Sequence, residues 1–124
     1  MAGLIDLQKH TDARGNLVVI EKVLPFEIKR IFYIYGVDHS VRGGHRHHET
    51  IQAAICIQGS CQITNNDGAK REIFHLSRPD QCLLIQPQDW HQMESFSNNA
   101  ILMVLASREY DPNDYIYQRY DDRI

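Results

Sequence analysis

The clearest chemistry in the chain belongs to a histidine pair in its first half. His45 and His47 are two residues apart in the segment Arg42-Gly-Gly-His-Arg-His-His-Glu49, so on an extended strand both imidazoles project from one face. The two glycines before them permit a tight bend or the close approach of a ligand. Because imidazole exchanges protons near neutral pH, the pair predicts an acid/base site. His48 points to the opposite face, where we expect it to be exposed or interfacial.

Histidines can also hold a metal ion, and a third one is available. His91 ends the segment Pro87-Gln-Asp-Trp-His91 and is a candidate metal ligand, third base or hydrogen-bonding wall residue. Neutral imidazole and carboxylate together suit Zn, Mn or Fe. Gln52, on the next expected strand, carries a carboxamide, which is a poorer ligand for a hard cation than a carboxylate. We therefore expect no metal and no other cofactor, and keep a metal-dependent enzyme as an alternative.

Short strands must position these residues. Runs of β-branched or aromatic residues closed by turn residues recur along the chain, and no helical stripe exceeds two turns. The expected strands are residues 17–23, 30–35, 50–58, 60–65, 71–76, 82–86, 92–95 and 100–106. Alternation in 50–58 places Gln52 on the face that can line a polar cavity. Eight strands suffice to close a small barrel or jelly roll that holds one small ligand, so the predicted fold class is all-β.

Length and composition bound the domain organisation. The chain has 124 residues, which is the size of one domain, and we expect a single domain over residues 1–124. Residues 108–124 are polar and rich in tyrosine. We expect this tail to pack on the barrel through Tyr110, Tyr115, Tyr117 and Tyr120.

The net charge, the hydrophobic pattern and the cysteines argue against several classes of protein. The net charge of −3 disfavours nonspecific nucleic-acid binding, and no segment approaches the roughly 20 apolar residues of a membrane helix. The amino terminus lacks the pattern of a secretory signal, so we expect a cytoplasmic location. Cys56, Cys61 and Cys82 are an odd number without Cys-x-x-Cys spacing and are expected to be reduced and buried.

Two levels of family resemblance follow from these motifs. The stretch from His45 to Gly59 resembles the first cupin motif, with Gln52 at the position usually held by Glu, and 87–91 resembles a degenerate second motif. A wider resemblance covers nearly the whole chain and is to the sugar 3,4-ketoisomerases. It is carried by Asp12-x-Arg14-Gly15, Lys29-Arg30-Ile-Phe-Tyr-Ile-Tyr-Gly36, Arg42-Gly-x-His45-x-His47, Trp90-His91 and Ala106-Ser-x-x-Tyr-Asp-x-x-Asp-Tyr-Ile116.

The resemblance implies a single-domain cupin jelly roll that acts on dTDP-4-keto-6-deoxyglucose in deoxysugar or polysaccharide biosynthesis. The enzyme would move the ketone from C4 to C3 through an enediolate, with His45 and His47 as acid and base in an order that the sequence leaves open. Tyr35 joins them as a catalytic candidate, because hydrogen-bond donors stabilise charge that develops on oxygen. A homodimer is also implied, in which the early strand 17–23 can pair with a partner's sheet edge.

A nucleoside diphosphate substrate calls for further side chains. Guanidinium groups match phosphate oxygens bidentately, and the available partners are Arg14, Arg30 and Arg42. Gln52 and His91 can line the pocket. Trp90 can stack on a thymine or sugar ring, although a single Trp in a small protein is often a core anchor.

Three alternatives stay open beside the ketoisomerase. A metal-dependent small cupin enzyme would be revealed by metal analysis. A noncatalytic sugar-binding cupin would bind without turnover. A dTDP-sugar epimerase needs a similar base but leaves the ketone in place.

Overall fold

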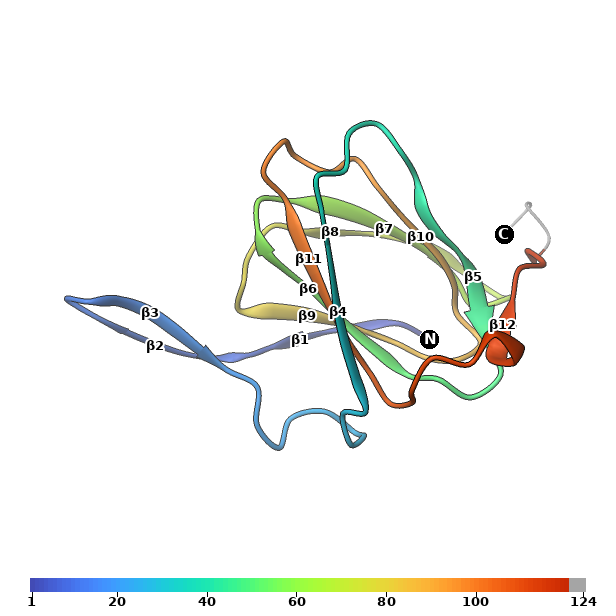
Figure 1. Ribbon diagram of the computed structural model, residues 1–124, viewed down its shortest axis with the longest axis horizontal. Helices are drawn as coiled ribbons and strands as arrows, with labels where there is room; N and C mark the ends of the chain where they lie inside the picture. Colours follow the sequence, from blue (N-terminus) through green and yellow to red (C-terminus); the bar gives the residue numbers. More distant parts are fainter. Residues whose placement is uncertain (121–124) are drawn as a thin grey trace.

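Twelve strands and one short 3-10 helix are the regular elements of residues 1–120 (Figure 1). The computed structural model describes residues 1–120. The strands are β1 (Gly3–Asp6), β2 (Gln8–Asp12), β3 (Gly15–Val19), β4 (Arg30–Tyr35), β5 (Arg42–His47), β6 (Gln52–Gln58), β7 (Cys61–Asn66), β8 (Arg71–Leu76), β9 (Gln81–Ile85), β10 (Trp90–Glu94), β11 (Ile101–Ala106) and β12 (Tyr115–Ile116). A short 3-10 helix, η1 (Pro112–Asp114), precedes β12.

Two five-stranded antiparallel sheets enclose the core. One has the strand order β1-β9-β6-β11-β4 and the other β12-β5-β10-β7-β8. Buried side chains from both sheets form one cluster, which includes Ala54 and Leu102 from the first sheet and Ile63 and Met93 from the second. Alternate residues of most strands in the two sheets supply this core. The all-β prediction is confirmed, and the architecture is a cupin jelly roll.

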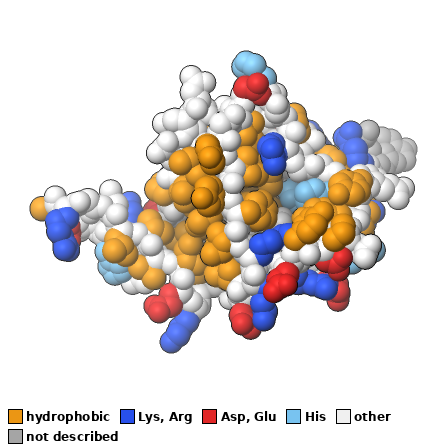
Figure 2. Space-filling model, in the orientation of Figure 1, with side chains coloured by type: hydrophobic (Ala, Val, Ile, Leu, Met, Phe, Trp, Pro, Cys, Tyr) orange, Lys and Arg blue, Asp and Glu red, His pale blue; other side chains and the backbone are white. Residues whose placement is uncertain are grey.

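The outer face of the first sheet is only partly covered. Residues 18–26 pack over a second cluster that contains Ala53, Ile55 and Leu105. Beyond this cover, hydrophobic side chains gather in an uncovered patch on the face seen in Figure 2, and we call this the β4 patch: Tyr33, Tyr35, Ile57, Ile101 and Met103. The β2–β3 hairpin projects from the barrel (Figure 1), and every residue of β2 is exposed.

Strand boundaries differ from the predictions mainly near the amino terminus. The expected strands 30–35 and 71–76 coincide with β4 and β8. The expected strand 17–23 was wrong beyond Val19, since a bend follows and Lys22 adopts a positive φ of 57°. Strands β1, β2 and β12 were missed because they are short and carry little apolar alternation. β5 was also absent from the eight expected strands, although the histidine pair on it was expected to lie on extended chain.

Two smaller expectations are also settled within residues 1–120. Cys56, Cys61 and Cys82 are buried free thiols, as predicted. No helix in this part of the chain has the length and apolar character needed to span a membrane.

Candidate active site

Three imidazoles meet inside the barrel. The ring centroids of His45 and His47, both on β5, lie 4.9 Å apart, as their spacing on one strand face predicts. His91 reaches them from the neighbouring β10, at 4.9 Å from His45 and 6.2 Å from His47. His91 is fully buried and His47 is 3% exposed. His48 is exposed, also as predicted.

A bulge between β5 and β10 sets this arrangement. His91 pairs with His45, but the next residue, Gln92, pairs with Gly43, so Gly44 is the extra residue. Gly43 and Gly44 both have a φ of +83°, a region that residues with a Cβ rarely adopt. A Cβ on Gly43 would also lie 3.1 Å from the carbonyl oxygen of His91. The glycine pair is therefore what lets His45 face His91.

Burial keeps these imidazoles neutral. It lowers the pKa of each of the three histidines to about 4 from the ordinary value of 6.5. Each histidine also feels a neighbour, because the charge of His91 disfavours protonation of His45 and the charge of His45 disfavours that of His47. The site therefore holds unprotonated imidazoles at neutral pH, which can act as bases.

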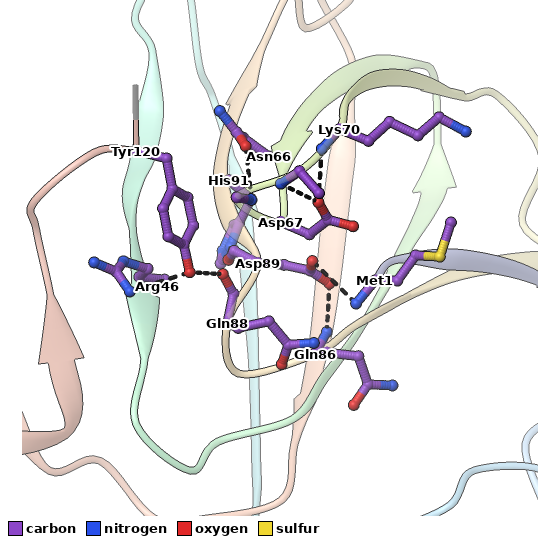
Figure 3. Close-up of polar contacts among 12 residues, drawn as sticks. Met1, Arg46, Asn66, Asp67, Lys70, Gln86, Gln88, Asp89, His91 and Tyr120 are labelled. Atoms are coloured by element: carbon purple, nitrogen blue, oxygen red, sulfur yellow. Dashed lines mark hydrogen bonds and ion pairs between the residues drawn. The ribbon is translucent and has the colours of Figure 1, made fainter. Parts of the chain in front are cut away.

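The tight turn before β10 fixes the orientation of His91 (Figure 3). His91 Nδ1 lies 3.1 Å from the backbone carbonyl oxygen of Asp89. A carbonyl only accepts, so Nδ1 carries the proton and Nε2 has the free lone pair. Asp89 is itself fully buried, and its carboxylate accepts the amide of Gln86 at 2.8 Å and lies 3.2 Å from the amino group of Met1.

The carboxy-terminal tail supplies residues that the sequence did not mark as part of the site. The ring centroid of Tyr115 lies 4.6 Å from that of His45 and 4.7 Å from that of His47. Tyr117 lies 6.2 Å from His45. The Tyr-Asp-x-x-Asp-Tyr motif was the available signal, although it indicated packing rather than a site. Of the tail tyrosines, Tyr110 and Tyr117 remain mostly exposed.

Arg30 and Gln52 face the same interior. The guanidinium of Arg30 lies 5.3 Å from the ring centroid of Phe32, on the inward face of β4, and 5.7 Å from that of Tyr110. Its positive charge helps to lower the pKa of both His45 and His47. Gln52 and Ala54 lie on the same face of β6, and Ala54 is part of the core. It is 2% exposed, and its side-chain oxygen has no hydrogen-bond partner among residues 1–120.

The remaining candidates do not converge on this centre. Tyr35 is 70% exposed and belongs to the β4 patch, on the outer side of its sheet. Trp90 alternates with His91 and therefore points to the outer side of β10, where the guanidinium of Arg119 covers it. Arg42 is exposed at the start of β5.

Arg14 lies at the tip of the projecting hairpin (Figure 1), where it forms an ion pair with Asp12. It is therefore remote from the histidines within one chain.

The donor side chains around the histidines do not suit a metal ion. Within residues 1–120, no group of three or more His, Cys, Asp or Glu side chains is arranged to hold a metal ion. The interior position that a cupin usually fills with Glu carries the carboxamide of Gln52. A carboxamide is a poor ligand for a hard cation, so the described residues do not fit a metal centre.

A jelly roll with paired interior histidines on a glycine-bent strand is the architecture of a cupin. Residues 2–123 match the family described as "FdtA: WxcM-like, C-terminal". The chain belongs to this family.

Its relatives share one activity in their names. The TDP-4-oxo-6-deoxy-alpha-D-glucose-3,4-oxoisomerase of Aneurinibacillus thermoaerophilus is 41% identical over 96% of this chain and 87% of its own length. The TDP-quinovose 3,4-ketoisomerase structure from Campylobacter jejuni is 42% identical, with a TM-score of 0.90 over 94% of this chain and 92% of that one.

A third comparison includes a bound sugar nucleotide. A histidine-to-asparagine variant of a 3,4-ketoisomerase from Thermoanaerobacterium thermosaccharolyticum, in complex with TDP-4-keto-6-deoxyglucose, is 38% identical. Its TM-score is 0.91 over 94% of this chain and 87% of that one.

Proposed function

We propose that this protein is a sugar-nucleotide 3,4-ketoisomerase that moves the ketone of dTDP-4-keto-6-deoxyglucose from C4 to C3. The observation that carries the proposal is the adjacent pair of neutral imidazoles, of which His47 is buried and His45 is partly buried. The names of three relatives at 38–42% identity support the reaction class.

The reaction needs only proton transfers. A base removes the proton from C3, and the electron pair of that bond forms the C3–C4 double bond of an enediolate. The charge moves to the oxygen on C4. A proton then returns at C4. The proton of the C3 hydroxyl passes to the oxygen on C4, so that C3 becomes the new ketone and C4 carries a hydroxyl. C3 is oxidised and C4 is reduced, so no external redox cofactor is consumed.

The interior residues suit these steps. His45 and His47 are the acid and base, each able to accept a proton because burial keeps it neutral. His91 presents Nε2 to the same space and is a further wall or proton-accepting group. The amide of Gln52 can donate to a substrate oxygen, and Arg30 and Arg42 supply positive charge for the diphosphate.

A homodimer is part of the proposal. The uncovered β4 patch and the unsupported β2–β3 hairpin are surfaces that a second copy can cover, since an isolated two-stranded hairpin is marginal in water. A partner's hairpin would also give Arg14 a route to a substrate phosphate. The buried free thiols are consistent with a cytoplasmic enzyme. We propose no nucleic-acid or membrane partner.

The test is proton NMR of dTDP-4-keto-6-deoxyglucose in deuterium oxide with chelator-treated protein. We expect a 3-keto sugar to form and deuterium to enter the sugar ring. His47→Asn should lower the rate by about a hundredfold or more, as loss of a positioned base does. His48→Asn, which changes the exposed neighbour, is the matched control and should keep the wild-type rate.

The outcomes separate the alternatives. Ring deuteration without ketone migration would indicate an epimerase. Binding without exchange or product would indicate a sugar-binding protein. Activity that returns only after a divalent ion is added would indicate a metal-dependent cupin. Each of these results would overturn the proposal.

A further inference from the structure

The carboxy-terminal tail is a strand of the active-site sheet. β12 pairs antiparallel with β5, with Tyr115 opposite His47 and Ile116 opposite Arg46. Directly opposed residues of an antiparallel pair project from the same face. The same register places Tyr117 opposite His45, so the tail brings one phenol to each histidine. The short ring distances of Tyr115 to both imidazoles follow from this pairing.

Asp114 fastens the tail directly beside the site. Its carboxylate accepts the backbone amides of Glu49 and Thr50, at 2.9 and 3.3 Å, and the hydroxyl of Thr50. Its own carbonyl oxygen accepts the amide of His48 at 3.0 Å. The residues held are the three that follow His47, so Asp114 fixes both the end of β5 and the start of β12.

The η1 turn sets the path of the tail into this clamp. Asp111 caps η1 by accepting the amide of Asn113 at 3.0 Å, and Pro112 has the fixed backbone angle suited to the first position. Asp114 is 5% exposed although it carries a carboxylate. A buried carboxylate with three donors in a terminal segment indicates that the position of the segment matters.

Tyr115 has an unused hydroxyl at this position. Its ring packs on both histidines, yet its hydroxyl makes no hydrogen bond to any residue among 1–120. An enediolate needs a donor near the oxygen that gains charge. Tyr35 cannot supply it from the outer β4 patch, and Tyr117 is 68% exposed. Tyr115 is therefore the enclosed phenol beside the pair.

We propose that Tyr115 is a further catalytic residue, whose hydroxyl donates a hydrogen bond to the substrate oxygen that becomes negatively charged, and that Asp114 is the positioning residue that holds it there. The inference rests on the proposed ketoisomerase function and extends it to the tail. The hydroxyl keeps its own proton throughout, because His45 and His47 perform the proton transfers.

The primary test is Tyr115→Phe, which keeps the ring and removes only the hydroxyl. We expect kcat to fall by about a hundredfold, the range seen when one such donor is lost, with KM changed by less than about threefold. The thermal unfolding midpoint should stay near that of the wild type. Tyr110→Phe is the matched control, because Tyr110 is 65% exposed and contacts the far side of Tyr115 at 5.7 Å.

A double-mutant cycle tests the positioning role. Asp114→Asn should lower kcat in the wild-type background but have little further effect on kcat in the Tyr115→Phe background, because both changes act through one hydroxyl. A purely structural role for Asp114 predicts equal losses in both backgrounds.

The outcomes distinguish the two proposals. If the wild type isomerises the sugar and Tyr115→Phe turns over within about threefold of it, Tyr115 is only a packing wall and this inference is overturned. If the wild type gives neither product nor exchange, the ketoisomerase function itself fails. A hundredfold loss in Tyr115→Phe with a normal Tyr110→Phe supports the inference.

Discussion

Acidification is expected to weaken the fold and the activity over a pH range set by the three buried imidazoles. The unfolded chain protonates its histidines near the ordinary value of 6.5, whereas burial lowers the pKa of His91 to about 4 in the folded protein. The unfolded state therefore takes up the proton first. Stability is complete above about pH 6.5 and falls as the pH falls toward about 4.

The magnitude follows from His91, which is fully buried. A pH of about 5 lies one and a half units below 6.5, and each unit corresponds to about 1.4 kcal/mol, so this residue alone lowers the free energy of unfolding by about 2 kcal/mol. His45 and His47 add to the same loss, because the pKa of each is also lowered to about 4. The activity should likewise persist below pH 6.5, with the acid limb of kcat/KM well under that value.

Urea unfolding at about pH 7.5 and about pH 5, followed by the fluorescence of the single buried Trp90, measures the loss. His91→Gln keeps a donor for the Asp89 carbonyl but cannot titrate. The decrease in its free energy of unfolding between the two pH values should therefore be smaller than that of the wild type by about 2 kcal/mol. His48→Gln, at an exposed position, should behave as wild type. Equal wild-type stability at both pH values, or an acid limb near 6.5, would refute buried neutral histidines.

Three other changes probe the parts that support the site. Gly43→Ala should lower the free energy of unfolding by about 1–3 kcal/mol and lower kcat, because a positive φ and the nearby His91 carbonyl oppose a methyl group. Thermal unfolding measures the first effect and steady-state kinetics the second. Asp89→Ala should lower the free energy of unfolding, measured in urea, by about 1–3 kcal/mol, since it leaves the Gln86 amide unpaired. If the proposed dimer forms through the β4 patch, Tyr33→Glu should give a monomer in sedimentation with the far-ultraviolet spectrum unchanged, because a carboxylate would be buried without a partner.

The histidine pair was predictable because it depends on local geometry. Two residues separated by one on a strand share a face, and the structure places the rings of His45 and His47 side by side. The same rule separates Trp90 from His91, so the sequence already contained the reason why these two cannot line one cavity. That consequence was missed because a motif, rather than strand alternation, was used to group them.

The position of Tyr35 shows where alternation reaches its limit. Alternation correctly pairs Tyr33 with Tyr35 on one face of β4 and Phe32 with Ile34 on the other. Both faces are apolar, so hydrophobicity does not indicate which one meets the core. The structure turns Phe32 and Ile34 inward and leaves the tyrosines outside. This choice depends on the register of β4 with β11, which is a long-range property.

The tail posed a different problem, because its partner strand lies far away in the sequence. Nothing local to Tyr115 indicates that it pairs with β5. In this sheet β12 is the edge strand and β5 lies next to it. Without β12, the backbone groups along that edge of β5 would be unpaired. The strand that carries the acid/base pair is thus held between β10, which brings His91, and β12, which brings Tyr115. Closure of the sheet edge and completion of the site depend on the same few hydrogen bonds, so a change that releases the tail should affect fold and chemistry together.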